Sequence, residues 1–341
     1  MDKKIEEIIS RAWEGKAPTY EEVVEMLECD EASPEATAIR GAADGIQREK
    51  TGNAATIWGQ IGIEVYPCEA DCQFCSFGKS HTCFTDHVVM PVDEVVRRAV
   101  EFAKGGDLYG LYLMTMNTFD EDHYLECVKA VREAVGPDVD LLVEVHRRLS
   151  PYHAIHFSER IQEYNPFWIE EPCLADNIDL IAQAHAGIKA PVVTGETLYN
   201  KEAFIPVFEK HAAEIINPDI CVSGIKVMSE ISAMAEPYSV LMSPHNFNSN
   251  AVGLAAMIHL SASIPNFLIG EMFLTVDEAS REIMVEPFEI KNGYVALPTK
   301  PGLGIDIDMD KLSQRPYKFF ERKFPFKGAC DYRDEFPKEG M

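Results

Sequence analysis

The sequence is poor in positive charge. Its 341 residues include 31 lysines and arginines against 56 aspartates and glutamates, which gives a formal net charge of −25 at pH 7. A surface this acidic would repel nucleic-acid phosphates and anionic lipids. General binding to nucleic acid or to a membrane surface is therefore excluded as the main activity.

Long apolar runs are missing as well. No stretch of about 18 consecutive apolar residues is present, which leaves no candidate for a transmembrane helix. The first ten residues, MDKKIEEIIS, lack the continuous apolar segment of a secretory signal peptide. The 9 cysteines are an odd number in a long chain, and three of them are crowded into one short segment. This usage predicts a cytoplasmic protein whose cysteines act as ligands rather than as disulfides.

The pattern of apolar residues predicts an α/β fold of the (β/α)8 TIM-barrel type. Residues 1–50 are predicted to form a helical extension, with Thr19 and Glu22 as a capping box. Strands are predicted at 57–65, 110–116, 141–145, 167–169, 191–194, 214–217, 239–242 and 267–269, and helices between them, for example at 92–104, 124–135, 151–164 and 201–210. Residues 276–341 form a C-terminal tail. An open doubly wound sheet is the alternative, disfavoured because no glycine-rich phosphate loop follows the first strand.

The predicted strand ends carry residues with chemical potential. In a TIM barrel the chemistry lies at the carboxyl ends of the strands. Here nearly every such position holds a ligand, an acid or a base, namely Cys68, Cys72 and Cys75 after the first strand, and Glu144, His146, Glu170, Glu171, Glu196, Asp219, His245 and Glu271 after the third to eighth strands. Scattered surface acids would rarely collect in this way.

Three of the acids predict a metal site. Glu144, Glu170 and Glu196 follow neighbouring strands and would point into one mouth, where bare carboxylates repel one another. A hard divalent cation such as Mg²⁺ relieves that repulsion. The metal would act as a Lewis acid on a substrate carboxylate and make the adjacent C–H bond acidic.

The histidines supply proton-transfer groups at the same mouth. His146 and His245 would flank the metal from different strands. Asp219 would hold His245 in one tautomer and raise its basicity. Glu271 would orient this pair or bind substrate.

The segments that carry these residues resemble the enolase superfamily, in its mandelate racemase and galactonate dehydratase branch. They read LLVEVHRRLSP, PFWIEEP, PVVTGE, IINPDIC, MSPHNFN and NFLIGE, and the tail NGYVALPTKPGLGIDID is also similar. The resemblance spans about residues 125–315. It implies Mg²⁺ on Glu144, Glu170 and Glu196, proton chemistry by His146 and the His245–Asp219 pair, and Glu271 nearby. The expected substrate is an acid sugar, which loses its α-proton and then its β-hydroxyl.

The sequence departs from that branch at three points. Glu144 stands where the branch usually has Asp. The K-x-K motif of the second strand is absent, because this strand reads LYLMTMNTF, and this disfavours racemisation by a lysine base. The long N-terminal capping region of the branch is not recognisable.

A second motif lies upstream, where Cys68, Cys72 and Cys75 form a C-x3-C-x2-C pattern. Three thiolates on one loop can hold three irons of a [4Fe-4S] cluster and leave the fourth iron open. Zinc is the competing interpretation, with Cys83, His81 or His87 as the fourth ligand. The third interpretation is that these are buried structural cysteines without a ligand.

This motif, with Phe74 before its third cysteine, resembles the radical S-adenosylmethionine superfamily, closest to its biotin synthase-like branch. The resemblance covers about residues 1–125. It implies a [4Fe-4S] cluster on Cys68, Cys72 and Cys75, with S-adenosylmethionine bound at the open iron.

The two resemblances predict a hybrid in one barrel, divided into residues 1–50, 51–125, 126–275 and 276–341. We expect a Mg²⁺-dependent lyase acting on a small carboxylate substrate. The alternatives are a radical S-adenosylmethionine enzyme and a catalytically silent chimera that serves as a metal-binding scaffold. Assembly into a homo-oligomer is compatible with either enzyme.

Overall fold

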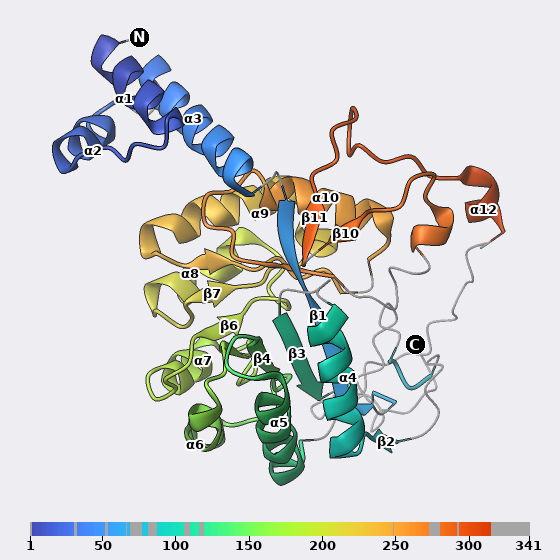
Figure 1. The fold of residues 1–341 in the computed structure, drawn as a ribbon. Coiled ribbons are helices and arrows are strands. Elements are labelled where there is room, and N and C mark those ends of the chain that lie inside the picture. Colours follow the sequence, from blue (N-terminus) through green and yellow to red (C-terminus); the bar gives the residue numbers. More distant parts are fainter. Residues whose placement is uncertain are drawn as a thin grey trace, which may run out of the picture. The chain divides into compact units, whose positions relative to one another are not determined.

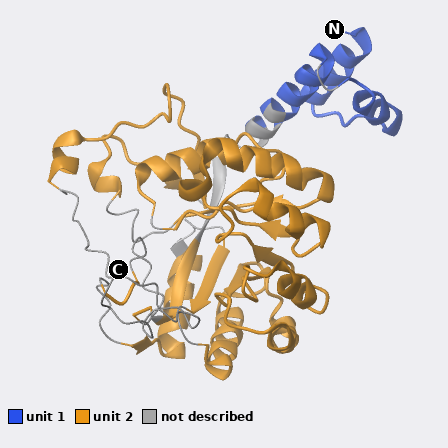
Figure 2. Cartoon of the chain, turned by 180° about the vertical axis from the view of Figure 1, so that it is seen from behind, with its two compact units in different colours: residues 1–55 blue, residues 56–341 orange. Residues whose placement is uncertain are grey.

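The computed structural model describes residues 2–30, 33–51, 54–65, 67–68, 77–80, 87–105, 110–115, 119–247, 249–272, 280–291 and 293–314. The chain forms two compact units, residues 1–55 and 56–341, which Figure 2 shows in different colours. The first unit is built from helices, and the second is built around a sheet.

Helices α1 (Lys3–Trp13), α2 (Tyr20–Leu27) and α3 (Pro34–Thr51) make up the first unit. α2 begins at the predicted capping box, in which the Thr19 hydroxyl accepts from the Glu22 N–H and the Glu22 carboxylate accepts from the Thr19 N–H. A Cβ at Gly45 of α3 would lie 2.5 Å from the Trp13 ring, so only glycine lets this ring approach so closely. The helices predicted for residues 1–50 are present.

Strands alternate with helices through the second unit (Figure 1). The parallel strands are β1 (Ala54–Val65), β3 (Gly110–Thr115), β4 (Asp140–Glu144), β5 (Trp168–Glu170), β6 (Val192–Thr194), β7 (Ile215–Ile216), β8 (Leu241–Met242) and β9 (Gly270–Glu271). The helices are α4 (Val92–Gly105), α5 (Glu121–Val135), α6 (Pro151–Ile161), α7 (Ile178–His185), α8 (Lys201–Glu209), α9 (Ile220–Ala235) and α10 (Ala251–Ser261), with 3-10 turns η1 (Gln162–Tyr164) and η2 (Glu236–Tyr238).

Short elements are added to this alternation. β2 (Val88–Val89) pairs antiparallel with β1. Near the C-terminal end, β10 (Ile290–Lys291) and β11 (Tyr294–Ala296) pair antiparallel, and the short helix α12 (Met309–Ser313) follows. Among the described residues, no helix is both long enough and apolar enough to cross a bilayer.

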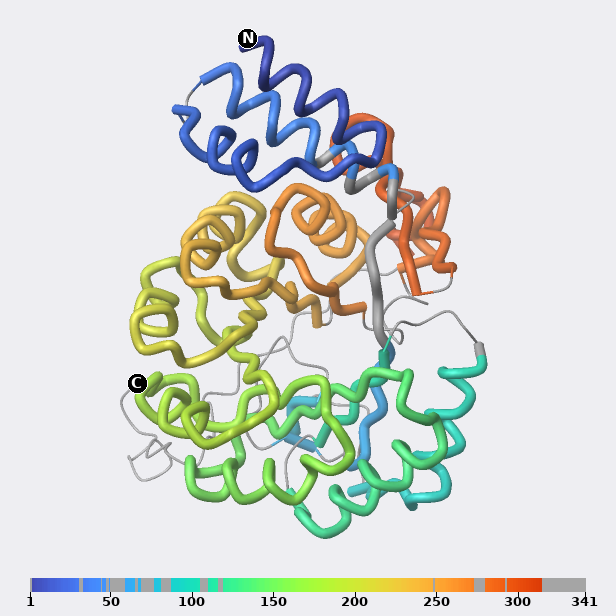
Figure 3. Tube along the Cα trace, turned by 60° about the vertical axis from the view of Figure 1, so that its left-hand side comes forward, coloured from blue at the N-terminus to red at the C-terminus, as the bar shows by residue number. Residues whose placement is uncertain are grey.

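The parallel strands close into a barrel. Each strand from β1 to β8 pairs with the next parallel strand, Met242 of β8 bridges to Phe267, and β9 pairs back onto Ile57 and Trp58 of β1. In Figure 3 the successive strand–helix units follow one another around this ring in the order of the sequence. The predicted (β/α)8 barrel is confirmed, and the open doubly wound alternative is wrong because its outer strands would stay unpaired.

Seven of the predicted strands overlap the observed ones, and the eighth is misplaced. The sequence predicted it at 267–269, whereas the strand that pairs with β1 is Gly270–Glu271. Phe267 instead bridges to β8, so the chain crosses from one neighbour to the other over these few residues. Strand stagger in a closed barrel produces such an offset, and an apolar run cannot reveal it.

Alternate residues of each strand enter two different cores. Leu111, Leu113, Leu141 and Val143 pack outward in a large cluster with the helices. Tyr112, Met114, Leu142 and Trp168 pack in a second, inner cluster with Val193, Ile215 and Ile269. Since side chains alternate along a strand, this pattern fixes which residues at the strand ends face the inside of the barrel.

Candidate active site

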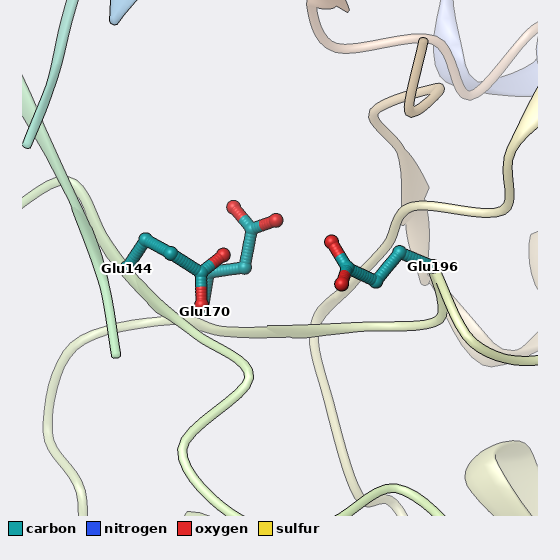
Figure 4. A group of neighbouring side chains, drawn as sticks. All are labelled: Glu144, Glu170 and Glu196. Carbon is teal, nitrogen blue, oxygen red and sulfur yellow. The ribbon is translucent and has the colours of Figure 1, made fainter. Parts of the chain in front are cut away.

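Strand register brings the three predicted metal ligands together. Glu144 lies two residues after the inward Leu142, and Glu170 lies two residues after the inward Trp168, so both carboxylates share the inner face. The two glutamates are paired residues in the β4–β5 ladder. Glu196 follows β6, and one ligand atom from each of the three carboxylates lies within 4.8 Å of the others. Figure 4 shows the Glu196 side chain pointing toward Glu144 and Glu170.

A glycine positions the third carboxylate. Gly195, between β6 and Glu196, has a φ of 139°, which side-chain-bearing residues rarely adopt. A Cβ at this position would lie 2.9 Å from the Phe204 ring and 3.2 Å from the Asn217 nitrogen. The turn that aims Glu196 at the mouth therefore requires glycine.

Hydrogen bonds hold the first two glutamates in place. The Tyr112 hydroxyl donates to Glu144 Oε2 at 2.5 Å, and the His146 N–H donates to Glu144 Oε1 at 2.5 Å. Asn217 Nδ2 donates to Glu170 Oε1 at 2.7 Å. Glu144 is 0% and Glu170 3% exposed, so these donors supply the polar contacts that water would otherwise provide.

Burial and mutual repulsion disfavour the charged forms of both side chains. Burial and the charges of Glu170 and Glu196 hold the pKa of Glu144 well above its ordinary value. Burial and the charges of Glu196 and Glu271 raise the pKa of Glu170 to about 8. Two buried carboxylates and that of the partly buried Glu196, which repel one another, are a donor set that fits a hard divalent cation such as Mg²⁺. The predicted ligands thus fit this metal by their chemistry.

His146 lies beside the first metal ligand, with its Nδ1 atom 4.0 Å from Glu144 Oε1. Its backbone is left-handed, with a φ of 46°, and Nδ1 donates a hydrogen bond to the Thr115 carbonyl at the end of β3. The Nε2 atom is then the one that can exchange a proton. Burial lowers the pKa of His146 to about 4.

His245 lies beside the third ligand. Its Nδ1 atom contacts Asp219 Oδ2 at 2.6 Å, and its Nε2 atom lies 3.2 Å from Glu196 Oε2 and 3.5 Å from Glu271 Oε2. Burial opposes a charge on this ring, but the charges of Glu271 and Glu196 and the bond to Asp219 outweigh it and raise the pKa of His245 well above its ordinary value. The predicted pair of His245 and Asp219 is present.

Glu271 is held from both sides. Gln60 of β1 donates to its Oε1 atom at 2.7 Å, and the Asn246 N–H donates to its Oε2 atom at 2.9 Å. Burial raises the pKa of this carboxyl, partly offset by the charge of His245. All of the residues predicted for metal and proton chemistry therefore surround one mouth at the carboxyl end of the barrel.

The sequence did not single out Arg147, which lies in the same mouth. Its guanidinium contacts Glu196 Oε1 and lies 3.6 Å from Glu171 Oε2. Glu171 is fully buried, and its Oε1 atom accepts from the Thr194 hydroxyl and the Gly195 N–H at 2.9 Å each. A signal was available, because so many acids predicted in one mouth require a counter-charge, and Arg147 directly follows His146.

The cysteine motif lies mainly outside the described residues. Cys72, Cys75 and Phe74 are outside them, as are Cys83 and His81 of the zinc alternative. Cys68 is described, and its N–H donates to the Phe77 carbonyl at 2.7 Å. His87 contacts the Glu64 carboxylate at 2.5 Å. The cluster, the bound S-adenosylmethionine and the zinc alternative stay predictions.

Residues 94–311 match the family described as enolase C-terminal domain-like, which is well over half of the chain. The chain belongs to this family. The match confirms the predicted resemblance to the enolase superfamily. It begins about thirty residues before the join that the sequence predicted near residue 125, so most of α4 and all of β3 also lie within it.

Curated relatives include several sugar-acid enzymes. The chain is 32% identical over 243 residues to a D-gluconate/D-galactonate dehydratase of Picrophilus torridus, covering 68% of this chain and 62% of that protein. It is 30% identical to a D-xylonate dehydratase of Haloferax volcanii, covering 56% and 46%. It is 29% identical to a D-galactarolactone cycloisomerase of Agrobacterium fabrum, covering 58% and 54%. The chain thus spans less than two thirds of the length of these relatives.

Solved structures agree on the fold. An enolase from Sargasso Sea environmental sequencing is similar with a TM-score of 0.65 and 26% identity, covering 81% of this chain and 70% of that one. A mandelate racemase/muconate lactonizing enzyme from Burkholderia has the same TM-score at 27% identity, covering 79% and 65%. Both similarities support the barrel described above.

Proposed function

We propose that this chain is a Mg²⁺-dependent hydro-lyase that removes the α-proton of a small carboxylate substrate and dehydrates an acid sugar. One observation supports the proposal above all: the ligand atoms of Glu144, Glu170 and Glu196 gather within 4.8 Å of one another, with a histidine beside each end of the group. The curated relatives that act on gluconate, galactonate and xylonate give the substrate class.

The three glutamates would hold the cation. When bound, Mg²⁺ supplies Lewis-acid chemistry at the substrate carboxylate and so makes the α-proton more acidic. The substrate would lie between the two histidines, because Nδ1 of each ring already has a partner, the Thr115 carbonyl or Asp219, and Nε2 is left for proton exchange.

His245 is the proposed base. Asp219 holds the proton on Nδ1. The charges of Glu271 and Glu196 raise the pKa of this ring, so Nε2 would become free to receive the α-proton once Glu196 is neutralised as a metal ligand. The carboxylate partner stabilises the imidazolium that forms. Glu271, 3.5 Å from Nε2, keeps the ring oriented toward the substrate.

His146 is the proposed acid. Its Nδ1 atom donates to a neutral carbonyl and burial lowers its pKa to about 4, so Nε2 must first take up a proton from solvent and then gives it up readily. That proton would reach the departing β-hydroxyl, which leaves as water. The remaining enol then gives a 2-keto-3-deoxy acid.

Calorimetry tests the metal site directly. Titration of Mg²⁺ into the chelator-treated chain is expected to show binding that a variant with Glu170→Gln and Glu196→Gln lacks. Glu159→Gln on α6 is a matched control, because this acid is largely exposed and lies on the outer helix layer. Equal binding by the wild type and the double variant would contradict the proposal.

Activity is tested with a panel of aldonic acids and detection of 2-keto-3-deoxy products. His245→Asn is expected to abolish exchange of the α-proton in deuterated water and to retain Mg²⁺ binding. If Mg²⁺ binds but no acid is dehydrated, the silent scaffold replaces the lyase. Metal analysis of protein purified without oxygen distinguishes the radical alternative, which requires about four irons per chain.

A further inference from the structure

Arg147 is a cation inside a mouth built to bind another cation. Its guanidinium contacts Glu196 Oε1, and the charges of Glu196 and Glu171 outweigh its burial and raise its pKa. The Glu196 Oε2 atom faces His245 Nε2 at 3.2 Å. Both oxygens of the third metal ligand are therefore already engaged with positively charged or proton-bearing groups.

A second acceptor lies within reach of the same guanidinium. The Oε2 atom of Glu171 is 3.6 Å from Arg147 Nη1. This atom is buried and has no hydrogen bond among the described residues, whereas Oε1 of the same carboxylate accepts two. A buried carboxylate oxygen without a donor is unfavourable, so a small side-chain movement of Arg147 would satisfy it.

The backbone of Arg147 is fixed, so only its side chain needs to move. The Arg147 N–H donates to the Glu171 carbonyl at 2.7 Å, and the Arg148 N–H donates to the Val145 carbonyl at 3.1 Å. Consecutive left-handed residues, His146 and Arg147, turn the chain here. The guanidinium can thus move between Glu196 and Glu171 from a fixed backbone position.

We propose that Arg147 is an internal counter-ion that competes with the divalent cation for Glu196. When the cation binds, the guanidinium transfers its hydrogen bond from Glu196 Oε1 to the free Oε2 atom of Glu171. Arg147 is thereby a positioning residue that sets the concentration of Mg²⁺ at which the site fills. The inference rests on the proposed metal site.

Removing the counter-ion should tighten metal binding. A guanidinium a few ångströms from a divalent cation repels it, even at the effective dielectric constant of protein sites. The repulsion energy is larger than the free energy that corresponds to a tenfold change in affinity. Arg147→Met is therefore expected to lower the dissociation constant for Mg²⁺ by about tenfold or more. Arg147→Lys keeps the charge and is expected to bind Mg²⁺ nearly as the wild type does.

The matched control is Arg160→Met. Arg160 of α6 also binds two carboxylates, those of Glu121 and Asp122, but it lies on the outer helix layer. This variant is expected to leave the calorimetric dissociation constant unchanged. The variant controls for the loss of one arginine and of its two ion pairs.

Glu171→Gln tests the other end of the proposed movement. The amide can still accept from Thr194 and Gly195, but it turns an NH2 group toward Arg147. The guanidinium then loses its charged alternative and stays on Glu196, so Mg²⁺ should bind several-fold more weakly. Opposite changes in Arg147→Met and Glu171→Gln are the expected signature.

A merely structural arginine gives a different result. Loss of either residue would then loosen the mouth and weaken Mg²⁺ binding in both variants, which overturns the inference. Unchanged binding in Arg147→Met also overturns it. If the wild type itself binds no Mg²⁺, the proposed function fails, and this outcome is distinct from failure of the counter-ion alone. Should Arg147→Met not fold, Arg147→Gln decides, because its amide can still donate to Glu196 but carries no charge: tighter Mg²⁺ binding is expected, and weaker or unchanged binding overturns the inference.

Discussion

Tyr112 connects the inner core of the barrel to the first proposed metal ligand. Its ring packs in the inner cluster with Leu142 and Trp168, and its hydroxyl donates to Glu144 Oε2. Burial, followed by the charge of Glu144, holds the pKa of this phenol well above its ordinary value, so the proton stays on the oxygen. The hydroxyl is thus a permanent donor to a buried carboxyl group.

Tyr112→Phe removes that donor and leaves the volume of the ring unchanged. We expect the free energy of unfolding of the metal-free chain to fall by about 1–3 kcal/mol, because Glu144 loses a hydrogen bond that water cannot replace. Urea unfolding measures the change. Tyr152→Phe is the control, since Tyr152 is 73% exposed; an equal loss in both variants would show that the hydroxyl of Tyr112 is not needed.

At the scale of elements, one ion pair links α7 to two strands. His185 in the last turn of α7 contacts Glu214 Oε1 at 2.5 Å, and Glu214 Oε2 accepts from the Val192 N–H at the start of β6. The bond to Glu214 raises the pKa of His185. Burial would raise the pKa of Glu214, but His185 and the Val192 N–H lower it overall.

These shifts define a pH window for stability. The raised pKa of His185 gives a contribution that is complete below about 6.5 and is lost as the pH rises through the folded-state value. The lowered pKa of Glu214 gives one that is lost as the pH falls below about 4.5. His185→Gln should therefore destabilise the chain at about pH 5.5 and much less at about pH 8.5.

The expected size of this effect is below about 1 kcal/mol, because Glu214 is half exposed and water screens the pair. Urea unfolding of wild type and His185→Gln at both pH values measures it. His156→Gln on α6 serves as the control, since this exposed ring lies 3.9 Å from its acidic partner. A deficit that grows with pH would contradict the assignment.

A substitution in a strand tests how much the inner core contributes to stability. Leu142 of β4 is fully buried inside the barrel, so Leu142→Ala should cost about 2–5 kcal/mol of unfolding free energy. Leu174→Ala, at a position 52% exposed, should change it by less than about 0.5 kcal/mol. Equal costs in urea unfolding would mean that the inner cluster contributes little to stability.

The sequence predicted those helices and strands whose signal lies within one short segment. Apolar runs located seven strands, and Thr19 with Glu22 located the start of α2. The position of β9 escaped them because strand stagger depends on barrel closure. The glutamates and histidines of the mouth followed from strand ends. Arg147 could be found only from the need of those acids for a counter-charge, and Asn217 acts through a contact between strands that no single segment encodes.

At the scale of the whole molecule, the charge of −25 is the dominant feature. Like charges repel one another across the folded surface and destabilise the compact state, while they attract divalent cations. Acidic groups also gather in the mouth of the barrel. The pKa values of Glu144, Glu170 and Glu271 are raised there, mainly by burial and further by neighbouring carboxylates. Salt should therefore act on stability and on metal affinity in opposite directions.

We expect the unfolding free energy of the chelator-treated chain at about pH 8 to rise as NaCl increases from about 0.02 to about 0.3 M, because the Debye length shrinks below the spacing of surface charges. The affinity for Mg²⁺ should fall over the same range, since screening weakens the attraction to the acidic surface. Urea unfolding and calorimetry measure the two effects. Near pH 5, close to the sequence pI of 4.7, the net charge is small, and the stabilisation by salt should shrink. An equal gain in stability at both pH values would mean that salt stabilises the chain by general salting-out and not by screening the repulsion between its charges.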